Sequence, residues 1–119
     1  MNAETVRAGL NLLLESGPEA VFEWLDPEVE MLGPVTSRWD CHGRDEVVRF
    51  LWEFQPGGTG LEVTEATDIG DRVLLGLHRR YGPRDERDSF SVVSFRKGLV
   101  IRLQGYSTRD QALEAIQQP

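Results

Sequence analysis

The first half of the chain repeats its apolar residues at the three- and four-residue intervals of amphipathic helices. This spacing predicts a first helix that stops at Gly17, a short second helix that starts at Pro18, and a third over residues 44–54. The second helix should end near Asp26, because Pro27 disfavours the helical conformation in the residue before it. The apolar faces of these helices comprise Val6, Leu10, Leu13 and Leu14; Val21, Phe22 and Leu25; and Val47, Phe50, Leu51 and Phe54.

The second half of the chain has the pattern of strands instead. Runs rich in Val, Thr, Ile and Phe alternate there with turn residues such as Gly70-Asp71 and Lys97-Gly98. A polar loop is expected over residues 82–86. Together with one short run in the first half, the pattern predicts strands over residues 28–32, 61–69, 72–81, 89–95 and 99–106.

The order of the predicted elements indicates the fold class. Thr108 and Gln111 form a capping-box pattern ahead of a short C-terminal helix. Helices that precede a run of hairpin-connected strands are typical of an α+β fold, with the helices packed on one face of an antiparallel sheet. A length of 119 residues suits one domain, which we expect to span residues 1–119.

The predicted strands are apolar on both faces. Over residues 72–81, for example, Val73, Leu75 and Leu77 alternate with Leu74 and Gly76. An antiparallel sheet with one face in water should instead alternate apolar and polar residues. Few helices remain to cover the second face, so a second copy of the chain is the simplest cover. We therefore expect a homodimer through the outer sheet face, with an interface that includes Leu75, Val92 and Tyr106.

Charge and composition narrow the classes of partner. A net charge of −7 argues against nucleic acid and against an anionic membrane surface, because both attract clustered Lys and Arg. No apolar run approaches the roughly 18 residues of a membrane span, and no signal-peptide pattern is present. The single cysteine is compatible with a cytoplasmic protein. Two distant histidines without metal-ligand spacing, and the lack of nucleotide-binding motifs, predict no metal and no cofactor.

Four stretches carry a resemblance to a known family, and they follow one another along most of the chain. They read SGPEAVFEWLDPEVEM, HGRDEVVRFL, DIGDRVLLGL and SFRKGLVIRLQGYSTRDQALEAI. In this order the chain resembles the SnoaL-like, ketosteroid-isomerase-like branch of the nuclear transport factor two-like superfamily. The resemblance implies a cone in which three N-terminal helices pack on a strongly curved antiparallel sheet and enclose a pocket. It also implies homodimers through the outer sheet face.

The resemblance does not imply one activity, because this superfamily includes isomerases, cyclases, epoxide hydrolases, dehydratases and non-catalytic binding modules. Its ketosteroid isomerases use a Tyr, an Asp general base and a protonated Asp. The resemblance places these positions near Gly9, Met31 and Ser91, none of which can do that work. Steroid isomerisation by this route is therefore not expected.

One candidate site is the run Trp39-Asp40-Cys41-His42, which the resemblance places at the mouth of the cone. In the functional interpretation, Trp39 stacks on a ligand while Asp40 or His42 acts as an acid or base. In the structural interpretation, Trp39 plugs the mouth, Asp40 is solvated and His42 flanks the entry to the third helix. Cys41 is interpreted as a small packing residue in either case.

The other candidate is His78, whose role depends on strand register. If alternate residues from Leu74 face inward, His78 is a titratable group on the pocket wall, and Gly76 opens space beside it. A shift by one residue puts His78 outside and makes Val73, Leu75 and Leu77 the wall. The inward register, which we favour, predicts a pocket lined by Met31, Trp39, Leu74, Gly76, Arg80, Ser89, Ser91 and Leu103. Trp24 and Trp52 are interpreted as core or interface residues.

Two functions remain open from the sequence. One is a binding or accessory module whose pocket holds an apolar metabolite. The alternative is a small-molecule enzyme that uses general acid–base chemistry, with His78 as the first candidate and Asp40 or His42 as the second. Convergence of His78, Asp40 and a serine on an open cavity would favour the enzyme.

Overall fold

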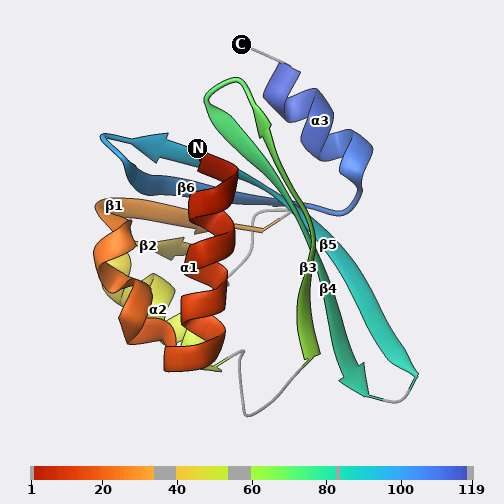
Figure 1. The fold of residues 1–119 in the computed structure, drawn as a ribbon, viewed down its shortest axis with the longest axis horizontal. Coiled ribbons are helices and arrows are strands. Elements are labelled where there is room, and N and C mark those ends of the chain that lie inside the picture. The colour runs from red at the N-terminus through yellow and green to blue at the C-terminus, as the bar shows by residue number, and fades with distance from the viewer. Residues whose placement is uncertain (1, 34–39, 54–59, 83, 118–119) are drawn as a thin grey trace.

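The computed structural model describes residues 2–33, 40–53, 60–82 and 84–117 and confirms the α+β fold (Figure 1). The helices are α1 (Asn2–Ser16), α2 (Arg44–Glu53) and α3 (Arg109–Gln117), with a 3-10 helix, η1 (Pro18–Trp24), between α1 and the first strand. The strands are β1 (Leu25–Leu32), β2 (Cys41–His42), β3 (Gly60–Ile69), β4 (Arg72–Gly82), β5 (Asp85–Arg96) and β6 (Leu99–Tyr106).

The described strands form one six-stranded sheet in the order β2-β1-β6-β5-β4-β3. Strands β3 to β6 form antiparallel pairs between consecutive neighbours, as predicted. Strand β1, however, runs parallel to β6, with Met31 beside Leu103, so the sheet is mixed and not purely antiparallel. A hairpin dictates antiparallel pairing, whereas strands that are distant in sequence are free to pair in either direction. The apolar pattern of β1 gave no sign of its direction.

The helices α1, η1 and α2 cover one face of the sheet, called here the inner face (Figure 1). Ala3 and Val6 of α1 pack on Val73, Leu75 and Val93 of the central strands. A second cluster on the same face joins Val47 of α2 to the buried side chains of Leu25, Val29 and Cys41. Burial of a side chain of this size stabilises a fold by about 1.5–3 kcal/mol, so these two clusters fix the helices on the sheet.

The opposite, outer face is covered in part by α3 (Figure 1). Leu74 and Val92 are buried there against Ala112, and Leu113 and Ile116 pack on the same cluster. A second copy of the chain was expected as the simplest cover for this face, but α3 covers Leu74 and Val92 instead. Leu75, which was expected on the outer face, lies in the inner cluster.

The β4–β5 hairpin is longer than the sequence predicted. Pairing continues from His78 opposite Asp88 to Arg80 opposite Glu86 and reaches Gly82 opposite Asp85, so most of the expected polar loop is strand. Figure 1 shows the resulting arm, which extends beyond the helices together with the start of β3. Arg80 and Glu86 are a pair of opposite charge, whereas Arg79 lies opposite Arg87. Cross-strand pairs of opposite charge stabilise a polar strand, and pairs of like charge do not.

Candidate functional site

A cavity of about 260 Å³ lies between the inner face of the sheet and the helices α1, η1 and α2. Each of these helices contributes to its wall, and strands β1, β4, β5 and β6 provide the rest. Three aromatic rings line it from different elements: Trp24 of η1, Phe50 of α2 and Phe95 of β5. Most of the remaining wall is aliphatic, from residues such as Leu13 and Leu103.

The chemistry of the cavity wall is uncharged. Among the described residues that line it, side-chain oxygen atoms come only from Thr5 and Ser91, and no carboxylate, imidazole, amine or guanidinium is present. Small residues leave the space open. Ser91 of β5 lies directly across from Gly105 of β6, and both belong to the wall.

The register of β4 is the second of the two that the sequence allowed. Leu75 and Leu77 line the cavity, whereas Leu74 is buried on the outer face beneath α3. Gly76 opens no space in the pocket: a Cβ at this position would lie 2.8 Å from Thr64 Oγ1 and 3.4 Å from the Phe90 ring. The predicted inward register was wrong because α3, which covers the apolar outer residues, was not assigned to that face.

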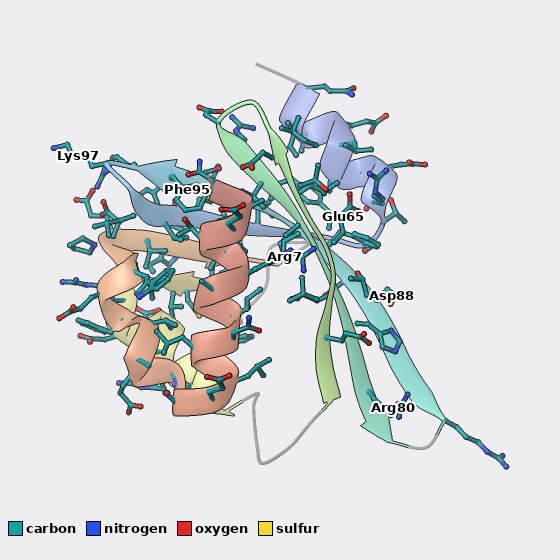
Figure 2. All side chains as sticks on the ribbon, in the orientation of Figure 1. Arg7, Glu65, Arg80, Asp88, Phe95 and Lys97 are labelled. Atoms are coloured by element: carbon teal, nitrogen blue, oxygen red, sulfur yellow. The ribbon has the colours of Figure 1, made fainter. Side chains whose placement is uncertain are left out.

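His78 therefore lies outside the cavity wall. Its Nδ1 is 2.7 Å from Oδ1 of Asp88, its partner across the β4–β5 pair, and 65% of the Asp88 side chain is exposed. Figure 2 shows Asp88 and Arg80 along the arm, away from the helices. Neither Arg80 nor Ser89, both exposed, belongs to the lining that was predicted for them.

Of the other predicted residues, Met31, Ser91 and Leu103 line the cavity as expected. Trp39 lies outside the described residues. The carboxylate of Asp40 accepts a hydrogen bond from the backbone N–H of Gly33 at 3.0 Å. His42 is exposed and its Nδ1 is 3.1 Å from Oε2 of Glu30. Neither Asp40 nor His42 belongs to the described wall, so His78, Asp40 and a serine do not converge on the cavity there, and only Ser91 lines it.

Comparisons with known proteins agree with this geometry. No protein-family model and no curated protein matches the sequence. Solved structures do match: an NTF2-like protein of unknown function from Burkholderia pseudomallei is 20% identical, with 98% of each chain covered and a TM-score of 0.69. A second NTF2-like protein of unknown function, from Mesorhizobium loti, is 22% identical, with 89% of each chain covered and a TM-score of 0.73. The chain has the nuclear transport factor two-like fold.

A third solved structure of this fold is a candidate ketosteroid isomerase from Kribbella flavida, with 22% identity, 87% of this chain and 74% of that chain covered, and a TM-score of 0.73. At these identities the likeness concerns the fold alone. Within the nuclear transport factor two-like fold of this chain, Gly9, Met31 and Ser91 all line the cavity. The three positions implied by the resemblance thus share one pocket, although none of them carries an acid or a base.

Sequence reasoning missed an ion pair that anchors this nuclear transport factor two-like sheet. Asp26, only 5% exposed, accepts hydrogen bonds from Arg96 Nη2 at 2.8 Å and Arg96 Nε at 3.2 Å. The backbone N–H of Glu28 donates to the same carboxylate at 2.8 Å. This N–H and the Arg96 guanidinium hold the pKa of Asp26 below its ordinary value. A carboxylate with these partners ties β1 to the β5–β6 hairpin, and its role is structural.

The part of the chain that the structure describes offers neither a metal site nor a membrane-spanning helix. No group of three or more His, Cys, Asp or Glu side chains there could hold a metal ion. None of its helices is long and apolar enough to cross a membrane.

Proposed function

We propose that the protein binds a compact, uncharged, apolar small molecule in the cavity between the helices and the inner sheet face. The observation that carries this proposal is the chemistry of the wall: its described side chains are apolar apart from two hydroxyl groups and the indole N–H of Trp24, and none of them is ionisable. A charged ligand would lose its hydration there without gaining a partner, which costs several kcal/mol. An apolar ligand gains roughly 25 cal/mol for each Å² of surface that leaves water.

The volume supports a small ligand. A dry apolar cavity of about 150 Å³ takes benzene, and sites for drug-sized ligands run from about 300 to 1,000 Å³. The volume of about 260 Å³ lies between these. We expect a ligand of one or two rings, or an aliphatic molecule of similar bulk.

The enzyme alternative has less support. A general base must come within hydrogen-bond reach of the proton that it removes. Of the three predicted acid–base residues, His78 lies on the arm, and neither Asp40 nor His42 belongs to the described wall. A serine hydroxyl is a weak nucleophile unless a base activates it, and the described wall offers Ser91 no such base. The likeness to a candidate ketosteroid isomerase concerns fold and does not supply one.

A matched pair of ligands tests the binding proposal. We expect 2-acetylnaphthalene, which is neutral, to raise the Tm, and 2-naphthoate, which has a similar shape and a charge, to have little effect at the same concentration. Saturation at one hundred times Kd would stabilise the protein by about 2.7 kcal/mol. Equal or tighter binding of the carboxylate in a calorimetric titration would contradict the proposal.

A matched pair of variants places the ligand. Ser91→Leu adds apolar volume to the cavity wall and should abolish binding of 2-acetylnaphthalene. Ser89→Leu makes the same change on the same strand and sheet face, at an exposed position outside the lining, and should leave binding unchanged. Binding that survives Ser91→Leu would show that the ligand sits elsewhere.

We also propose that the protein forms a homodimer through the part of the outer face that α3 leaves uncovered. Phe90 and Tyr106 lie directly across from each other on β5 and β6 and pack at the border of the α3 cluster. Both are only partly buried. Aromatic residues are enriched at the centres of protein interfaces, so this pair is the expected centre of contact.

A further inference from the structure

One ring of the cavity wall is held in an unusual way. Trp24 of η1 packs directly on Gly9 of α1: a Cβ added at Gly9 would lie 3.2 Å from Cε3 and 3.3 Å from Cζ3 of the indole. Both distances are shorter than ordinary contact. The indole thus rests against the helix backbone, and both residues line the cavity. Only glycine allows this approach without displacing the ring.

We propose that Trp24 is the specificity-determining residue of the cavity, and that its ring, seated on Gly9, selects planar aromatic ligands of one or two fused rings. This inference rests on the proposed binding function and adds the ligand class to it. Trp24 acts in two ways. As part of the wall its ring takes up space that a ligand would otherwise fill, and it offers a flat aromatic surface on which a planar ligand can stack.

The preference for a planar ligand follows from the rings of the wall. Trp24, Phe50 and Phe95 approach one cavity from a 3-10 helix, an α-helix and a strand. Stacked or edge-to-face aromatic pairs gain affinity beyond the area that they bury. For a single ring pair this gain corresponds to about a 3- to 10-fold change in Kd. A saturated ligand of the same carbon skeleton buries similar area without this gain.

Trp24 is chosen over the two phenylalanines because its ring packs directly against the backbone of α1 at Gly9. Its contact with Gly9 leaves no room for the ring to retreat toward α1. A ring with a fixed position stacks on a ligand without losing rotamer freedom, which lowers the cost of binding. Conversely, any side chain at position 9 must push the ring away from α1, and the empty volume beside it lies within the cavity.

The test compares naphthalene-2-methanol, which is planar and neutral, with its saturated counterpart decahydronaphthalene-2-methanol. Calorimetric titration gives the ratio of the two Kd values. We expect the unmodified protein to bind the planar probe at least 3-fold more tightly, and Trp24→Leu to bring the ratio close to one while the saturated probe still binds. The matched control is Phe22→Leu, because Phe22 lies on the same short helix, packs under Arg44 and does not line the cavity. Its ratio should equal that of the unmodified protein.

A second variant keeps the proposal open to refutation if Trp24→Leu does not fold. Gly9→Ala pushes the Trp24 ring into the cavity. It should raise the Kd for naphthalene-2-methanol, which has two rings, at least 3-fold. It should leave the Kd for benzyl alcohol, which has one ring, unchanged. A Trp24→Leu variant that keeps the planar preference, or a Gly9→Ala variant that binds both probes as before, would overturn the inference. Equal binding of planar and saturated probes by the unmodified protein would overturn it too, while leaving the binding function intact. If the unmodified protein binds no neutral probe, the proposed function itself fails, and this inference with it.

Discussion

At the scale of single residues, the most consequential polar contact lies outside the cavity. Asp26 is the second residue of β1, and its carboxylate is held by Arg96, the last residue of β5, two strands away in the sheet. The local sequence around Asp26-Pro27 does not predict this partner, because Arg96 lies 70 positions away along the chain. The contact therefore holds β1 in place, and the same strand contributes Met31 to the cavity wall.

Acid should weaken this contact in a defined pH window. Because the folded-state pKa of Asp26 lies below its ordinary value of 3.8, its carboxylate stabilises the fold above about pH 4. That stabilisation is lost as the pH falls toward the folded-state pKa. Asp26→Asn should therefore lower the Tm at pH 7, and its difference from the unmodified protein should shrink below pH 4. Thermal unfolding from pH 7 to 2 checks this.

Asp71→Asn is the matched control for Asp26→Asn, because Asp71 is exposed in the β3–β4 turn. It should have little effect on the Tm throughout the same range. A deficit for Asp26→Asn that stays constant from pH 7 to 2 would show that the loss does not arise from the carboxylate charge.

At the scale of elements, the docking of α3 decides which side chains of β4 and β5 lie on the outer face and which line the cavity. Its start is capped by Thr108, whose hydroxyl accepts a hydrogen bond from the backbone N–H of Gln111 at 3.2 Å. Arg109 then forms two hydrogen bonds to Glu65 of β3, at 2.8 and 3.0 Å. The Arg109 guanidinium lowers the pKa of the Glu65 carboxyl. These contacts hold α3 over Leu74 and Val92.

Removal of the cap should cost measurable stability. Thr108→Ala deletes the hydroxyl that satisfies the first turn of α3, and such a change costs about 0.5–2 kcal/mol. Urea unfolding should show this loss in the free energy of unfolding. Ser107→Ala, one residue earlier, keeps its own backbone N–H bond to Gln111 and should change the free energy far less. Equal losses for the two variants would contradict the assignment of the cap.

The sequence predicted the elements well and their faces less well, for physical reasons. Helical spacing and turn residues report local structure, so α1, α2, α3, β3, β4 and β6 lie close to their predicted positions. β1 and β5 begin several residues earlier than predicted, and β2 was not predicted. A strand with apolar residues on both faces satisfies either register, and only the docking of α3 decides between them. The predicted pocket therefore shared Met31, Ser91 and Leu103 with the observed one and misplaced His78. The rings at Trp24, Phe50 and Phe95 looked like ordinary core residues because their spacing is that of a core.

At the scale of the whole molecule, the proposed dimer depends on the part of the outer sheet face, around Phe90 and Tyr106, that α3 does not cover. Tyr106→Glu would place an unpaired charge at the proposed contact, which is costly to bury. We expect the dimer Kd to rise at least tenfold, equivalent to about 1.4 kcal/mol. Sedimentation across a range of concentrations measures this. Ser107→Glu adds the same charge at the next, exposed residue and should change the Kd less. A monomeric mass at all concentrations would refute the dimer.

The parallel pairing of β1 with β6 also sets an order of events in folding. Met31 and Leu32 of β1 line the cavity together with Leu103 and Gly105 of β6, so the wall joins segments from opposite ends of the sequence. Contacts between such distant segments form slowly, because a long stretch of chain must be ordered first. β1 is synthesised before its parallel neighbour β6, and several other elements lie between them along the chain. The part of the pocket wall that the two strands share therefore cannot form until β6 has been made.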